Sequence, residues 1–158
     1  MTEDNTTPEQ TDFMCDYAAK DRAFKALSTS LHVANKKTLF DALEAAGITS
    51  VLVHFDGYGD SGQVEDIDAV SGDQPRDLPT GTVVIARAHW GTSETEQAEC
   101  SVRDAVEALA YAFLEETHGG WENNQGAYGE FTFTVANRSI VLDYNERFES
   151  SEYSQHLF

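Results

Sequence analysis

Apolar residues recur three or four positions apart in some stretches of this chain and two positions apart in others. The first spacing is typical of a helix with one buried stripe, and the second of a strand with one buried face. Both occur here, in the order helical region, three strands, helix, two strands. We therefore expect an α+β fold: a single domain with a largely antiparallel sheet, one long helix packed on one face, and N-terminal helices.

The N-terminal helical spacing begins at Phe24 and continues with Leu27 and Leu31. A second helical stretch follows Asn35, a residue type that often caps a helix N-terminus, and Gly47 is placed to end it. The pattern allows either one kinked helix or two.

The start of the chain, MTEDNTTPEQTD, is polar and acidic, with almost nothing apolar. We expect residues 1–19 to form a disordered acidic leader and residues 20–158 to form the single α+β domain. A domain of this size buries roughly two-thirds of its unfolded surface, so it needs no metal or disulfide to hold its core. The two cysteines are too few for a disulfide framework.

The long helix is predicted to begin after Ser101, because the sequence from Ser101 to Asp104 imitates a capping box with Asp in place of Glu or Gln. It should end near His118, where two glycines follow. The strands are expected at residues 48–55, 64–67, 82–90, 131–135 and 140–144. The segment 82–90 is rich in branched side chains, so it should be a central strand buried on both faces.

Acidic residues outnumber basic ones by 28 to 10, which gives a net charge of −18. Such a surface repels the phosphates of nucleic acids and anionic membranes, so we expect neither as a direct partner. No apolar run approaches the roughly 18 residues of a transmembrane helix, and the start is unlike a signal peptide. These features predict a cytoplasmic protein, and they leave its oligomeric state open.

The excess of acid lies mainly in residues 60–158, which contain nineteen acidic residues and five basic ones. One explanation is a solvated surface that aids solubility or suits a host with high internal salt. The other is a surface complementary to a basic protein partner, such as a nucleic-acid-binding protein whose cleft it fills in place of phosphates. The sequence leaves both explanations open.

The segment 56–62, DGYGDSG, consists of turn-forming residues between two predicted strands. It matches G-x-G-x-x-G, but a strand rather than a helix follows, so we do not expect a dinucleotide site here. Its spacing also fails the EF-hand pattern. Carboxylates could still converge here on a divalent cation, and no other cofactor is expected. The candidate metal ligands are Asp56, Asp60, Glu65 and Glu122.

Two more clusters combine aromatic, amide and charged side chains. Residues 119–126, GGWENNQG, connect the long helix to the last hairpin, and residues 143–148, DYNERF, end the last strand. Such side chains orient ligands in binding loops, although Asn and Gly are also ordinary turn formers and Trp121 could simply plug the core. The candidate binding residues of all three segments are Asp56, Tyr58, Asp60, Ser61, Glu65, Trp121, Glu122, Asn123, Asn124, Asn145, Glu146 and Arg147.

Taken together, the blocks FDGYGDSGQVEDI, HGGWENNQGAYGEFTFTV and SIVLDYNERF resemble an uncharacterised family of small bacterial proteins, known only as a domain of unknown function. The similarity runs from about Asn35 to the C-terminus. The resemblance implies that relatives are often plasmid- or phage-borne, and it implies no established activity. It also implies one shared site, formed by the matching residues Asp56, Gly57, Gly59, Asp60, Ser61, Gly62, Glu65, Gly120, Trp121, Glu122, Asn123, Asn124, Gly126, Asn145, Glu146 and Arg147.

The first functional hypothesis is an acidic cytoplasmic protein-interaction module, an inhibitor or adaptor that docks on a basic, nucleic-acid-binding partner. The alternative is a divalent-metal-dependent hydrolase in which a carboxylate cluster holds the metal that activates water. Both hypotheses require the three blocks to meet. We therefore predict that Asp60, Glu122 and Asn145 lie on one side of the domain and line one cleft. Trp121 should form part of the wall, with its indole N–H hydrogen-bonded.

Overall fold

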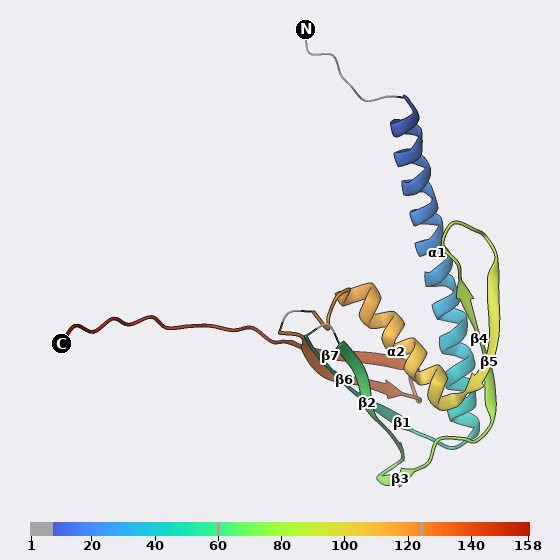
Figure 1. Ribbon diagram of the computed structural model, residues 1–158. Coiled ribbons are helices and arrows are strands. Elements are labelled where there is room, and N and C mark those ends of the chain that lie inside the picture. Colours follow the sequence, from blue (N-terminus) through green and yellow to red (C-terminus); the bar gives the residue numbers. More distant parts are fainter. Residues whose placement is uncertain (1–7, 60, 124) are drawn as a thin grey trace.

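A computed structural model describes residues 8–59, 61–123 and 125–158 of the chain (Figure 1). Two helices and seven strands form a single α+β domain, which confirms the predicted fold class. The elements in chain order are α1 (Pro8–Ala45), β1 (Ser50–Tyr58), β2 (Ser61–Ser71), β3 (Gln74–Arg76), β4 (Thr82–Ala88), β5 (Thr95–Ser101), α2 (Val102–His118), β6 (Ala127–Thr134) and β7 (Ser139–Glu146).

The main sheet has five strands in the order β3-β2-β1-β6-β7, and every neighbouring pair is antiparallel. The predicted hairpins are therefore present: β1 returns through β2, and β6 returns through β7. A bulge between His54 and Phe55 shifts the register of β1 against β2. This sheet carries the first and third sequence blocks, and the second block runs from the end of α2 through a loop into β6.

One face of the main sheet carries the hydrophobic core. The alternation in β1 buries Val51, Val53 and Phe55, as expected for a half-buried strand. Both helices add side chains to the same core: α1 gives Leu39, Phe40 and Leu43, and α2 gives Val102, Ala105, Val106, Leu109, Ala110 and Leu114. Phe40 of α1 and Phe133 of β6 lie with ring centroids 6.1 Å apart. The helices therefore cover one sheet face.

The prediction of a central strand at 82–90 is wrong. β4 ends at Ala88 and pairs with β5 in a separate two-stranded sheet, which lies along α1 (Figure 1). Val83 faces the core, but Val84 is 48% exposed, so one face of β4 is open. The strand β5 was not predicted, because its sequence TEQAECS lacks alternating apolar residues.

The N-terminal predictions also need correction. Helix α1 runs unbroken from Pro8 to Ala45, so Asn35 lies inside a helix and caps none. The helix includes residues 8–19, which we expected to be disordered, while residues 1–7 lie outside the described part. Proline is favoured in the first turn of a helix. Ion pairs four residues apart, such as Lys20 with Asp16 at 3.0 Å, support the turns that follow.

Helix α2 begins as predicted. The Ser101 hydroxyl accepts a hydrogen bond from the backbone N–H of Asp104 at 3.1 Å, and this bond caps the N-terminus. The helix ends at His118, next to the glycines of the loop that contains Trp121. None of the helical segments within the described ranges is long and apolar enough to cross a membrane.

Candidate functional site

The three sequence blocks meet at one end of the main sheet. Gly57 and Gly62 pair with each other one position before the end of the β1–β2 hairpin, and the ring of Trp121 lies against both. A Cβ atom at Gly62 would lie 2.5 Å from the ring atom Cη2 of Trp121, and one at Gly57 would lie 2.6 Å from Cζ3. Only residues without a side chain fit under this indole. Packing therefore accounts for two of the glycines in the first block.

Gly126 of the second block and Arg147 of the third block both contact Gly57 of the first block. Gly126 has a φ of +78°, and a Cβ atom there would collide with the carbonyl oxygen of Gly57. Arg147 donates from Nη1 to that same oxygen at 2.9 Å and forms an ion pair with Asp56 at 3.0 Å. Its guanidinium carbon lies 4.6 Å from the centroid of the Tyr128 ring. Arg147 is therefore a structural brace whose charge is already matched.

An aromatic column rises from the core to the surface beside this brace. Phe55 stacks on Tyr144 with centroids 6.3 Å apart, and Tyr144 stacks on His118 at 3.6 Å with an interplanar angle of 3°. Trp121 meets Phe55 edge-on at 5.4 Å. Burial, followed by the nearby charges of Glu146 and Glu122, raises the pKa of Tyr144 above its usual value. The hydroxyl end of Tyr144 thus lies in a negative environment.

A cavity of about 330 Å³ opens where the column reaches the surface. The residues that line it are His118, Gly119, Gly120, Trp121, Asn123, Gln125, Gly126, Tyr144, Glu146, Arg147 and Phe148. Four of them are candidate binding residues from the sequence, namely Trp121, Asn123, Glu146 and Arg147, and Gly120 and Gly126 belong to the set that the family resemblance implied. Sequence reasoning missed His118, Gln125 and Tyr144, although all three lie in or next to the quoted blocks. The stacking of His118, at the end of α2, on Tyr144 of β7 cannot be predicted from a single sequence, because the two residues are distant in the chain.

The remaining candidates that the structure describes lie around this end of the sheet but outside the cavity. Glu122 sits against Gly62, while Tyr58, Ser61 and Glu65 are exposed on the hairpin. Asn145 pairs in register with Tyr128 on the sheet. Asp60 and Asn124 lie outside the described residues. The three blocks therefore come together, but the described candidates do not all line one cleft.

The indole N–H of Trp121 does not form the hydrogen bond that we predicted, as far as the described residues go. Trp121 is only 8% exposed, and its ring fills the space above two glycines. Its observed contacts are those of a core aromatic residue that also forms a cavity wall.

The carboxylates proposed as metal ligands are not gathered in the described structure. Within residues 8–59, 61–123 and 125–158, no group of three or more His, Cys, Asp or Glu side chains could hold a metal ion. Asp56 is paired with Arg147 instead. The hydrolase hypothesis therefore gains no supporting observation from this part of the chain.

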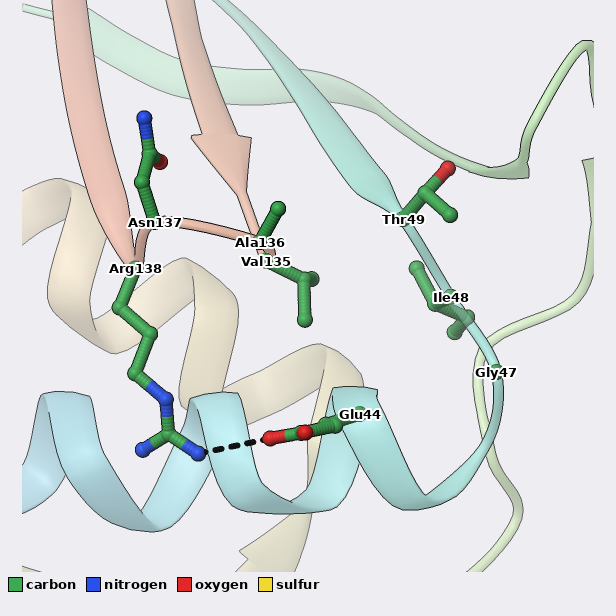
Figure 2. A pocket seen from close by; sticks show the side chains of 8 residues that line it. All are labelled: Glu44, Gly47, Ile48, Thr49, Val135, Ala136, Asn137 and Arg138. Carbon is green, nitrogen blue, oxygen red and sulfur yellow. Dashed lines mark hydrogen bonds and ion pairs between the residues drawn. The ribbon is translucent and has the colours of Figure 1, made fainter.

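A second cavity, of about 530 Å³, lies at the opposite end of the sheet, near the β6–β7 turn (Figure 2). Arg138 borders it and is the one described non-glycine residue with a positive φ, +52°. The guanidinium bonds to Asp41 at 2.6 Å and to Glu44 at 2.9 Å. Because two carboxylates already neutralise Arg138, the described residues that line this cavity offer no free cation for an anionic ligand.

Comparison with known protein families assigns the chain to one family. Residues 31–158 match the model of a family of unknown function, DUF6878. The chain belongs to this family. No curated protein and no solved structure matches it. The DUF6878 match begins inside α1 and covers both sheets. The family region therefore includes the end of the main sheet where the three sequence blocks meet, which we call the signature end.

The sheet face opposite the core adds a feature of this DUF6878 protein that sequence reasoning missed. Directly paired residues of antiparallel strands point to the same face. One row across the sheet is Asp66, His54, Glu130 and Asp143, and the rows on either side add Asp68 and Asp56. We call the five carboxylates Asp56, Asp66, Asp68, Glu130 and Asp143 the acidic face. The sequence does carry a signal for this face, because these acidic residues occupy strand positions that alternate with the buried apolar ones.

Proposed function

We propose that this protein is an acidic interaction module of the cytoplasm, whose acidic face binds a basic segment of a partner protein. A partner that normally binds nucleic acid is the best fit, because its basic surface is shaped to meet rows of negative charge. Binding there would make the protein an inhibitor or an adaptor.

The observation that carries the proposal is the concentration of charge on one open sheet face. Five carboxylates project from four adjacent strands on the side away from the helices. The basic side chains beside them already have acidic partners: His54 lies 2.6 Å from Glu130, and Arg147 lies 3.0 Å from Asp56. Asp66, Asp68 and Asp143 are exposed. A basic partner would relieve the mutual repulsion of these groups.

The test is to compare two triple variants with the same net charge. Asp66→Asn, Asp68→Asn and Asp143→Asn together neutralise the acidic face. The control combines Asp73→Asn, Asp77→Asn and Glu94→Gln, which are exposed residues that do not belong to the acidic face. The probe is a lysine- and arginine-rich peptide, with binding measured by calorimetry at low and high salt.

The first variant should lower the affinity about tenfold, and the control should change it much less. The wild-type affinity should fall as salt rises, because exposed charges are screened beyond about 10 Å at 0.1 M. Equal losses in both triple variants would mean that only total charge matters, and the proposed docking face would then be wrong. Binding that is indifferent to salt would also contradict it.

A further inference from the structure

We infer that the cavity at the signature end receives an arginine side chain of the basic partner. This inference rests on the proposed function, since it names a second contact of the same partner. It differs from the acidic face in location, because Tyr144 and Glu146 pair with Gly129 and Ala127 on the core side of the sheet. The cavity therefore lies around the sheet end from the acidic face.

The floor of the cavity is suited to a planar group. Tyr144 stacks closely on His118 and more distantly on Phe55, and His118 is the exposed member of this column. A guanidinium group is flat and weakly hydrated, so it stacks on such rings better than an ammonium group does. Stacking on the exposed imidazole would extend the column by one layer.

The charge of the cavity favours a cation. Glu146 lines the cavity, and Glu122 is close enough to Tyr144 to act on it electrostatically. The positive charge of Arg147, which also borders the cavity, is held by Asp56 and by the carbonyl oxygen of Gly57. Among the described residues, the cavity therefore has a carboxylate that can pair with a cation, while its own Arg147 is already paired with Asp56.

The size and polarity of the cavity fit one side chain. Its volume of about 330 Å³ is at the low end of the roughly 300–1,000 Å³ typical of ligand sites. Asn123 and Gln125 also line the cavity, so their amide groups add acceptor oxygens to its wall. A guanidinium has five N–H donors, so it can bond to a carboxylate and an amide at once, which an ammonium on a flexible stem does less selectively.

The experiment titrates the full chain with three capped tripeptides, Gly-Arg-Gly, Gly-Lys-Gly and Gly-citrulline-Gly, and follows the NMR signals of the His118 ring and the Trp121 indole. Citrulline keeps the shape of arginine but lacks its charge. We expect the arginine peptide to shift these signals most, the lysine peptide less, and the citrulline peptide little.

Glu146→Gln should weaken the arginine peptide about tenfold, since it replaces a charge-assisted bond with a neutral one. The matched control is Glu99→Gln on β5, which should leave binding unchanged. Equal binding of the three peptides, or no effect of Glu146→Gln in a variant that retains the wild-type fold, would overturn the inference. The triple variant of the acidic face separates the two proposals, because it should leave the binding of the arginine tripeptide unchanged. A failed test of the acidic face therefore does not count against the cavity, and a failed test of the cavity does not count against the acidic face.

Discussion

Asn35 of α1 and Ala86 of β4 exchange two hydrogen bonds across 51 positions of sequence. The Nδ2 atom donates to the carbonyl oxygen of Ala86 at 2.8 Å, and the backbone N–H of Ala86 donates to Oδ1 at 2.8 Å. The amide of a helix residue thus takes the place of a third strand beside β4. A two-stranded ribbon is marginally stable by itself, so this contact is one of those that hold the β4–β5 sheet on α1.

Replacing Asn35 with alanine should destabilise the protein by about 1–3 kcal/mol, because two backbone groups of Ala86 lose their partners in a partly buried place. The measurement is chemical denaturation, together with hydrogen exchange of the Ala86 amide. That amide should lose protection more than the amides of β6 do. Val33→Ala, at a site that is 68% exposed on the same helix, is the control and should change little.

The fit between Gly62 and Trp121 predicts a second destabilising change. Gly62→Ala would place a methyl group 2.5 Å from the indole, which should cost about 1–3 kcal/mol of unfolding free energy through overpacking. Gly81→Ala is the matched control, since nothing lies within 4 Å of a Cβ atom there. It should have a small effect of either sign.

A double-mutant cycle decides whether the indole is the cause. In a Trp121→Leu background, the ring atoms that meet the new methyl group are absent, so Gly62→Ala should cost less than it does in the wild type. Equal costs in the two backgrounds would place the strain of Gly62→Ala elsewhere on the hairpin.

The elements that the sequence predicts well are those with a strong local pattern. Phe131 and Phe133 alternate with threonines and become the buried face of β6, and Ser101 caps α2 as its spacing suggests. Trp121 belongs to a block that was singled out, and the three blocks do meet. In each case a short-range pattern agrees with the tertiary packing.

What the sequence does not predict depends on contacts distant in the chain. The segment at Val83 and Val84 is as branched as a central strand, but its partner is the polar β5 and its support is an amide of α1. Likewise, His118 becomes part of the site because Tyr144 lies under its ring. Neither neighbour can be found from spacing, since each lies on a different element.

The ion pairs at the β6–β7 turn predict a pH dependence. Hydrogen bonds from Lys37 and Arg138 hold the pKa of Asp41 below its usual 3.8. A lowered pKa in the folded state stabilises the fold above pH 3.8, and this contribution is lost as the pH falls through the folded pKa. Asp41→Asn should therefore be less stable than the wild type at pH 6, and the difference should shrink below pH 4.

Thermal unfolding of the wild type and Asp41→Asn between pH 6 and pH 3 measures this convergence. The effect should be small, because Asp41 is exposed and solvent screens its charge. Asp73→Asn, on the exposed loop before β3, is the control. If the difference in thermal stability between the wild type and Asp41→Asn persists at pH 3, then the shape or packing of the side chain, and not its charge, causes the destabilisation.

The raised pKa of Tyr144 gives a test of the negative environment at the cavity. Burial contributes most, and Glu146 and then Glu122 add to it. The folded protein therefore favours the neutral phenol, so Tyr144 stabilises the fold fully below pH 10 and this stability is lost as the pH rises through the folded pKa. Tyr144 should therefore ionise at a higher pH than a tyrosine in the unfolded chain.

Absorbance of phenolate, compared between the wild type and Tyr144→Phe, isolates the titration of Tyr144 from that of the other five tyrosines. Glu146→Gln should move this titration to lower pH, because it removes a repelling charge but keeps the burial. If Tyr144 ionises at the same pH with and without Glu146, the two groups are electrostatically independent, and the carboxylate is not directed at the end of the aromatic column.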